Sequence, residues 1–234
     1  MSSLYGLLFL LLLGYAGWFA IQAIPYYKSH YWEVTHKHFI FVLFDKGAYG
    51  EWLTYKCLMN YEKTGAKFLY NCYLPAKEKE TSEIDVMMIY HSGIYVFESK
   101  NYSGWIFGSE KNKTWTQSLP SGRKSVKEKF YNPIMQNRTH VKWLRKQIGD
   151  QDLVSNIVVF SERCELKKVE VTSTDVWVVK RNNLSKTVKK LDQDIGNVLS
   201  DERISEIYDK LYPFTQVSNE VKEQHVQDIE ENYK

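Results

Sequence analysis

The sequence has 234 residues, a net charge of +3 and an aromatic content of 15%. This length leaves room for one substantial domain beside a hydrophobic N-terminal segment. The nearly balanced charge gives no global basic field of the kind that marks many nucleic-acid-binding proteins. Three cysteines without C-x-x-C spacing argue against a disulfide framework or a zinc site and agree with a reducing compartment: Cys57, Cys72 and Cys164.

The N-terminal segment predicts a membrane anchor. Leu4–Ile24 contains no charged residue and is about one bilayer thickness long as a helix. No basic residue precedes it and no clear A-x-A site follows, which favours a retained anchor over residues 1–27 rather than a cleaved signal peptide. Aromatic residues near its end suit an interfacial belt: Trp18, Tyr26 and Tyr27.

Positive charge lies only on the C-terminal side of this segment, beginning with Lys28 and Lys37. The positive-inside rule therefore predicts a single-pass protein of the cell membrane with its C-terminal domain in the cytoplasm. Residues 28–44 are interpreted as a juxtamembrane linker. Its histidines fit no helical face well, so we expect packing or interfacial roles rather than metal binding: His30, His36 and His38.

The first helix of the domain is expected from Gly47 to about Lys63, with its end near Gly65. Glu51 then falls in the first turn. There its carboxylate either interacts favourably with the helix dipole or supplies an acidic group to a site. A recurrence every four residues predicts a buried stripe, with Trp52 and Leu58 beside it: Tyr49, Leu53, Cys57 and Tyr61.

Three strands are expected next. Lys67–Leu74 is the first, followed by a charged loop over 75–82. Two apolar runs, Ile84–Tyr90 and Ile94–Lys100, flank the turn at His91–Gly93 and predict a β-hairpin.

Three charged residues interrupt this hairpin: Asp85, Glu98 and Lys100. Glu98 and Lys100 project from one side of a strand, and an antiparallel return brings Asp85 alongside them. Two carboxylates beside an ammonium suit a hard divalent cation. The structural alternative is an Asp that caps a turn and a Glu-x-Lys that forms a solvated face.

The next part of the chain predicts a short strand or turn at 105–107, a polar loop or lid over 111–122 and a basic stretch over 123–129. Asn132 is a good N-cap and Pro133 suits the first helical position, so a second helix is expected from there to Gly149. Its apolar face is Ile134, Val141, Leu144 and Ile148. Its cations either meet phosphates or form a solvated face: Arg138, Lys142, Arg145 and Lys146.

The C-terminal part predicts interior strands at 156–160 and 175–180. A final helix follows, with Val198, Ile204, Ile207 and Leu211 as apolar candidates, and Pro213 stops it. The expected division is a core domain over 45–165, a strand and helix that complete it over 166–213, and a polar tail over 214–234. That tail is expected to be loose or to form a weak amphipathic helix.

Five segments in this order and spacing resemble the nuclease-related domain (NERD) family, a branch of the PD-(D/E)xK nuclease-like superfamily: G-A-Y-G-E (47–51), E-I-D (83–85), G-I-Y-V-F-E-S-K-N-Y-S-G (93–104), W-T-Q (115–117) and N-P-I-M-Q-N-R-T-H (132–140). The resemblance covers about residues 45 to 160. It implies an α/β fold with a restriction-endonuclease-like αβββαβ core, a central mixed sheet flanked by helices, and here one preceding transmembrane helix.

The resemblance also implies roles for single residues. Asp85 matches the metal-binding Asp, Glu98 the second carboxylate and Lys100 the catalytic lysine. Glu51 matches the helical acidic residue and Gln136 the Gln of the N-P-x-x-Q segment. Ile84 stands where the superfamily label has Pro. Mg²⁺ or Mn²⁺ is the implied metal, because carboxylate oxygens suit these ions.

Two functions from different classes follow. The first is a membrane-anchored, Mg²⁺-dependent nuclease that hydrolyses phosphodiester bonds of nucleic acid, with DNA as the expected substrate. The second is a membrane-tethered scaffold that uses the nuclease fold to hold nucleic acid or a protein without cutting. A third interpretation, a structural Tyr-rich domain, is supported by the composition alone. A homodimer is a further option, since many superfamily enzymes act as dimers.

Overall fold

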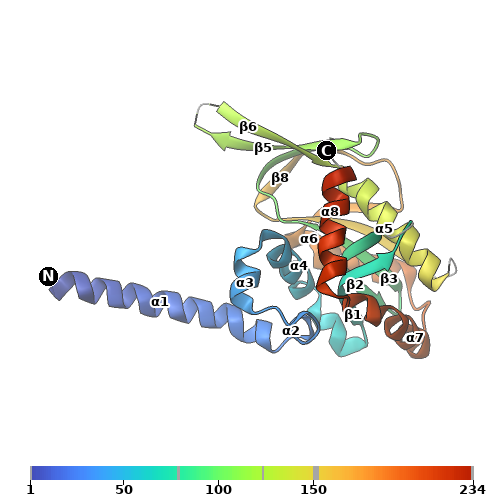
Figure 1. The fold of residues 1–234 in the computed structure, drawn as a ribbon, viewed down its shortest axis with the longest axis horizontal. Coiled ribbons are helices and arrows are strands. Elements are labelled where there is room, and N and C mark those ends of the chain that lie inside the picture. Colours follow the sequence, from blue (N-terminus) through green and yellow to red (C-terminus); the bar gives the residue numbers. More distant parts are fainter. Residues whose placement is uncertain (1, 78–79, 123, 150–152, 233–234) are drawn as a thin grey trace.

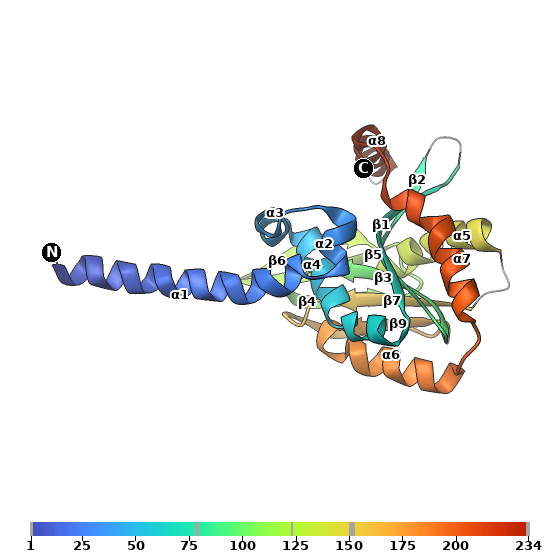
Figure 2. The same cartoon turned by 90° about the horizontal axis from the view of Figure 1, so that it is seen from below.

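The computed structural model describes residues 2–77, 80–122, 124–149 and 153–232. A long N-terminal helix projects from a body of two sheets and surrounding helices (Figures 1 and 2). The predicted class is confirmed: the fold is mixed α/β, with two mixed sheets flanked by helices and one apolar helix at the N-terminus.

The larger sheet has the strand order β1-β2-β3-β7-β9. Strands β1 to β3 are antiparallel neighbours, whereas β3, β7 and β9 are parallel. The predicted hairpin is therefore the centre of this sheet. Its strands are β1 (Lys67–Pro75), β2 (Thr81–Tyr90), β3 (Gly93–Lys100), β7 (Val154–Phe160) and β9 (Val176–Lys180).

Helices cover both faces of this sheet. Helices α4 (Lys46–Lys56) and α6 (Arg181–Ile195) pack on one face in a core that contains Trp52, Phe97 and Val188. Helices α5 (Pro133–Ile148) and α7 (Asp201–Leu211) pack on the other face with Ile94 and Leu144. The chain ends in a 3₁₀ helix, η2 (Tyr212–Thr215), and helix α8 (Asn219–Asn232).

The smaller sheet has the order β6-β5-β4-β8. Strands β5 and β6 form a ribbon that extends beyond the body in Figure 1. Trp115 and Ile106 anchor this sheet on Phe160 of the larger one. Its strands are β4 (Gly104–Ser109), β5 (Thr114–Ser121), β6 (Lys124–Tyr131) and β8 (Cys164–Glu170).

In the described residues, four α-helices and one 3₁₀ helix precede the first strand. Residues 28–44, which the sequence suggests as a linker, form the short helices α2 (His30–Thr35) and α3 (Phe39–Phe44) after α1 (Ser2–Tyr27). The long helix expected to Lys63 ends at Lys56 and is followed by the 3₁₀ helix η1 (Met59–Thr64).

The expected stripe in the first domain helix is confirmed only in part. Its four members are partly buried against the core, whereas Trp52 and Leu58, expected beside the stripe, are buried together with Ala48 and Tyr55. The helix begins at Lys46, capped by the Asp45 side chain, so Glu51 lies in the second turn rather than the first. The dipole explanation for Glu51 therefore does not apply.

The structure differs from the prediction in other places because polar segments form strands and helices there. The loop expected over 111–122 contains β5, and neither β8 nor α6 was predicted. Val198 is 53% exposed and lies outside the last core helix. The tail, expected to be either loose or a weak amphipathic helix, forms helix α8, in agreement with the second alternative.

Candidate active site

The strand register places Asp85 across from Glu98. Val86 pairs with Phe97 in the β2–β3 ladder, so Asp85 and Glu98 occupy the next opposed positions. The backbone amide of Ser99 donates a hydrogen bond to Oδ2 of Asp85 at 2.8 Å. The structure thus brings the Asp85 end of one strand to the Glu98–Lys100 end of the other.

Glu98 is almost fully buried, with 1% of its surface exposed. Its Oε1 lies 2.6 Å from Nζ of Lys100, and its Oε2 lies 3.2 Å from Nε2 of His140. The His140 contact lacks hydrogen-bond alignment, so within the described chain Oε2 has no hydrogen-bond donor. Burial acts to raise the pKa of Glu98, but Lys100 and His140 outweigh it and hold the pKa below its ordinary value.

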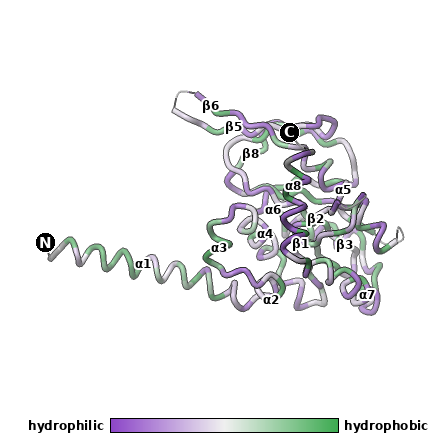
Figure 3. Tube along the Cα trace, viewed as in Figure 1, coloured by the Kyte–Doolittle hydropathy of each residue, from purple (hydrophilic) through white to green (hydrophobic). Residues whose placement is uncertain are grey.

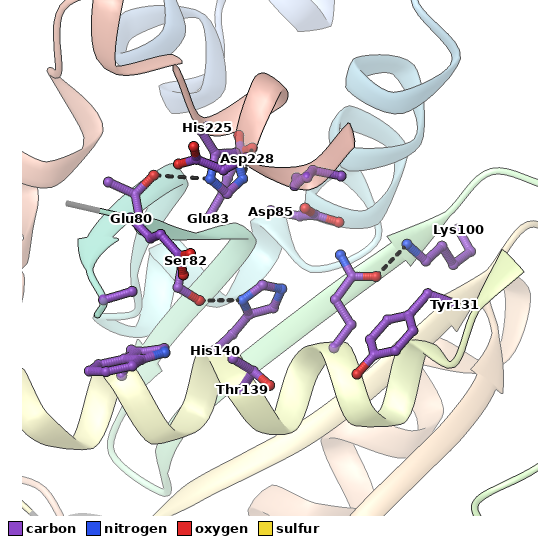
Figure 4. A pocket seen from close by; sticks show the side chains of 15 residues that line it. Glu80, Ser82, Glu83, Asp85, Lys100, Tyr131, Thr139, His140, His225 and Asp228 are labelled. Carbon is purple, nitrogen blue, oxygen red and sulfur yellow. Dashed lines mark hydrogen bonds and ion pairs between the residues drawn. The ribbon is translucent and has the colours of Figure 1, made fainter. Parts of the chain in front are cut away.

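Lys100 joins the carboxylates to helix α5. Its Nζ donates a hydrogen bond to Oε1 of Gln136 at 3.0 Å (Figure 4). Burial acts to lower the pKa of Lys100, but the charges of Glu98 and Asp85 raise it above its ordinary value. Lys100 is therefore a fixed ammonium at this site.

His140 belongs to the same group, although the sequence analysis assigned it no role. Its Nδ1 shares a hydrogen bond with Oγ of Ser82 on β2 at 2.7 Å, and its Nε2 faces Glu98 on β3. Asn132 caps α5 and Pro133 opens it, as predicted. A signal was available, since His140 follows Gln136 by four residues and shares its helix face.

Glu51 approaches the site from α4. Its Oε2 accepts hydrogen bonds from Nδ2 of Asn71 at 2.8 Å and from Oη of Tyr31 at 3.2 Å. Burial raises the pKa of Glu51 to about 7. Gly50 permits this approach, because a Cβ at that position would lie 2.9 Å from Cβ of Asn101 at the end of β3.

Asn71 is the second residue that the sequence analysis missed. It has a φ of 46°, and its neighbours Tyr70 and Cys72 pair with Val86 and Ile84, so it lies opposite Asp85. Asn tolerates this left-handed conformation better than most residues. The available signal was one polar amide inside an otherwise apolar strand.

The charge balance suits a divalent cation. Burial, together with the negative charges of Glu98 and Glu51, raises the pKa of Asp85 well above its ordinary value. A cation there would relieve this repulsion, and the buried Oε2 of Glu98 has no competing donor. The described residues contain no group of three or more acidic, His or Cys side chains spaced for a metal. The two carboxylates, Asp85 and Glu98, are the type of ligand set that Mg²⁺ uses where it binds one or two carboxylates and keeps several waters.

Comparison with known proteins agrees with this geometry. The family model of the nuclease-related domain matches residues 46–161, which contain Glu51, Asp85, Glu98, Lys100 and Gln136. An uncharacterized protein of Bacillus anthracis is 30% identical over 181 residues, which are 77% of this chain and 82% of that protein. This chain belongs to the nuclease-related domain family. No solved structure matches it.

A cavity of about 550 Å³ opens beside these residues of the nuclease-related domain. Asp85, Lys100, Gln136 and His140 line one part of it. Helix α8, which lies outside the matched residues, lines another part with His225, Asp228 and Ile229 (Figure 4).

His225 fixes α8 over strand β2. Its Nδ1 shares a hydrogen bond with Oγ1 of Thr81 at 3.0 Å, and its Nε2 lies 3.5 Å from Oε2 of Glu83. The ring also packs edge-on against Tyr73 at 5.5 Å between centroids. The sequence analysis did not place this helix at the site of the nuclease-related domain.

The four predicted nucleic-acid-binding cations lie in different settings. Arg138 is paired within the domain, because its Nη2 donates to Oε1 of Glu110 at 2.6 Å and to Oγ of Ser173 at 2.8 Å. Lys146 lies over the Trp143 ring at 4.0 Å, and Lys142 at 5.5 Å. The three predicted cations other than Arg138 have exposed side chains on α5: Lys142, Arg145 and Lys146.

Proposed function

We propose that this protein is a membrane-anchored, divalent-metal-dependent nuclease that hydrolyses phosphodiester bonds of nucleic acid, with DNA as its substrate. One observation carries the proposal. In a nuclease-related domain, the buried carboxylate of Glu98 faces the half-buried Asp85 across two strands, with the Lys100 ammonium 2.6 Å from Glu98 at a cavity.

Each residue of the site has its own role in the proposed hydrolysis. A Mg²⁺ or Mn²⁺ ion held by Asp85 and Glu98 would activate a water and offset the charge of the phosphate. Lys100 keeps a positive charge at the cavity wall, where a phosphate oxygen gains negative charge as water attacks and the P–O bond breaks. Gln136 accepts a hydrogen bond from the lysine head, and Glu51 places a further carboxyl group near Asp85. Lys142, Arg145 and Lys146 give the flanking strand cationic contacts.

Helix α1 supports the membrane anchor. Leu4–Tyr27 is long and apolar enough to cross a membrane by length and composition, and most of its surface is exposed (Figure 3). Its last turns pack into the domain, where Ala23 is 6% exposed and Tyr26 is fully buried. A segment that completes the core favours retention over cleavage as a signal peptide. The positive charge after α1 supports a cytoplasmic domain.

Cleavage by the full-length protein in detergent micelles tests the activity. Plasmid and single-stranded DNA are incubated with Mg²⁺, Mn²⁺ or EDTA. The Glu98→Gln/Lys100→Met variant is expected to lose about 10²-fold or more in rate. The Asp85→Asn variant is expected to lose metal binding as well. Metal-independent cutting, or full activity in Asp85→Asn, would contradict the proposal.

The chain offers a matched control. Glu165 and Lys167 form the same Glu-x-Lys pattern on β8, with Oε1 and Nζ 2.8 Å apart, but both side chains are largely exposed. The Glu165→Gln/Lys167→Met variant removes the same charges from a strand outside the cavity. It is expected to cut DNA like the unmodified protein.

A second function, a tethered scaffold that binds without cutting, is favoured by helix α8. Its Asp228 side chain lines the same cavity as Asp85, where it adds negative charge near an incoming phosphate. Binding of labelled DNA in EDTA separates the two functions. A scaffold binds but does not cut after Mg²⁺ is added, whereas the proposed nuclease does both.

A further inference from the structure

Helix α3 has an apolar surface that no described part of the chain covers. Ile40, Phe41 and Phe44 are 38%, 69% and 77% exposed, whereas Phe39 and Val42 on the other side of the helix are buried. Residues 39–44 contain no polar side chain. Two phenylalanines exposed to this extent on one short helix are costly in water.

This helix is attached to the proposed membrane span. The Phe39 ring lies 5.4 Å from the Phe19 ring and 5.1 Å from the Tyr26 ring of α1. Two tyrosines fix the start of α3: Oη of Tyr26 donates to the Lys37 carbonyl at 2.5 Å, and Oη of Tyr27 accepts from the Phe39 amide at 3.2 Å. Figures 1 and 2 both show α3 beside the end of α1 that joins the domain.

The length of α1 sets the depth of this contact. The 24 residues of Leu4–Tyr27 extend about 36 Å as a helix, which exceeds the hydrocarbon core of about 30 Å. A core that begins at Leu4 ends near Ala23, beyond Phe19. A helix that packs on both Phe19 and Tyr26 therefore lies across the boundary between acyl chains and headgroups.

We propose that α3 is a second membrane contact, which inserts Ile40, Phe41 and Phe44 into the bilayer interface on the domain side. The inference rests on the proposed anchor and adds a lipid surface as the partner of this face. The continuity of the face with α1 favours lipid over a protein partner. Two contacts at different positions hold the nuclease-related domain at one orientation to the membrane, whereas a single helix allows it to rotate about the helix axis.

Lipid quenching of site-specific labels tests the inference. Full-length protein with Cys57→Ala, which removes the half-buried native thiol, carries an NBD label on Phe41→Cys or Phe44→Cys. The proteins are reconstituted in vesicles whose lipids bear quenchers at shallow depth. Both rings are largely exposed, so these changes leave the buried Phe39 and Val42 in place, and circular dichroism checks each fold.

Two reference labels calibrate the result. Leu12→Cys lies on the exposed surface of the span, at 67% exposure, and reports on the anchor with quenchers near the bilayer centre. Val198→Cys is an exposed apolar position in the loop between α6 and α7, at the end of the domain away from α1 in Figure 2. It represents a water-exposed site. Ile40→Cys replaces either test position if that protein does not fold.

We expect shallow quenchers to reduce emission at positions 41 and 44 at least about 2-fold and to leave position 198 unchanged. Emission at 41 and 44 that matches 198, while position 12 is quenched, overturns the inference and leaves the anchor intact. Absence of quenching at position 12 as well overturns both. Label self-quenching at 41 that rises with protein density, without lipid quenching, assigns the face to a second copy and also overturns the inference.

Discussion

Nε2 of His140 lies 3.2 Å from Oε2 of Glu98, so helix α5 supports the carboxylate that strand β3 carries. The other ring nitrogen of His140 is bonded to Ser82, which fixes the orientation of the imidazole. The ring is 7% exposed. His140 therefore acts as a positioning residue for Glu98.

Removal of this support is expected to weaken metal binding. His140→Ala removes one of the two side chains in the described chain that contact the Glu98 carboxylate, and residues that orient a metal ligand typically contribute 10- to 100-fold, so a loss of about that size in metal affinity is expected. Calorimetric titration with Mn²⁺ measures it. Thr139→Ala is the matched control, because Thr139 is an exposed neighbour whose hydroxyl donates a hydrogen bond to the Met135 carbonyl within α5. Equal affinities in the two variants would contradict the assignment.

The Glu98–Lys100 pair is expected to be strongly coupled in stability. Glu98→Gln leaves the partly buried Lys100 ammonium without its carboxylate and is expected to lower the free energy of unfolding by about 3–5 kcal/mol. Glu98→Gln/Lys100→Met removes both charges and is expected to cost much less. Urea unfolding of the two single variants and the double variant gives the coupling energy. The exposed Glu165–Lys167 pair is expected to yield less than about 1 kcal/mol in the same cycle.

Glu110 is expected to make the fold sensitive to acid. Its carboxylate accepts hydrogen bonds from the Ser173 hydroxyl and from the Thr172 and Ser173 amides, and it pairs with Arg138. These contacts hold the pKa of Glu110 below its ordinary value of 4.5. Because the folded pKa is the lower one, the stabilisation is complete above pH 4.5 and is lost as pH falls through the folded pKa.

Thermal unfolding between about pH 7 and pH 3 checks this. Glu110→Gln is expected to unfold at a lower temperature than the unmodified protein at neutral pH, with a difference that narrows as the pH falls. Glu165→Gln, on the exposed side of β8, is the charge-matched control. A constant difference across the range would show that Glu110 contributes through packing rather than through its ionisation.

His225 is expected to control the attachment of α8. His225→Ala removes the contacts with Thr81, Glu83 and Tyr73, so the amides of α8 are expected to lose most of their protection from hydrogen exchange while β2 and β3 keep theirs. Gln224→Ala is the control, since Gln224 is exposed and bonds within the helix to Asp228. Unchanged protection of α8 in His225→Ala would mean that other contacts hold it.

The carboxylate pair could be predicted because its determinants are local. Two apolar runs around a short Gly-containing turn fix an antiparallel register, and that register alone brings Asp85 opposite Glu98. The start of α5 could also be predicted, because Asn132 and Pro133 act within one turn of the helix. The α/β class followed from the order of such elements.

The rest of the site depends on how distant elements pack. His140 reaches Glu98 only because α5 crosses the sheet at that point, and Asn71 meets Glu51 only because β1 turns to a left-handed φ there. Strand β6 is exposed on both faces over its first six residues. Its sequence therefore lacks the alternation of apolar and polar residues that would predict a strand. Helix α6 did carry a signal, since Leu184, Val188 and Leu191 recur at helical spacing and are buried.

The last turn of α1 has a consequence for how this protein can be handled and where it can work. Tyr26 is surrounded by the rings of Tyr31, Phe39 and Trp52, at 5.8, 5.1 and 4.9 Å between centroids. A fragment that begins at Lys28 lacks this ring and exposes the others to water, so we expect it to aggregate. Proteolytic shedding after α1 would therefore yield a damaged domain rather than a free, diffusing one.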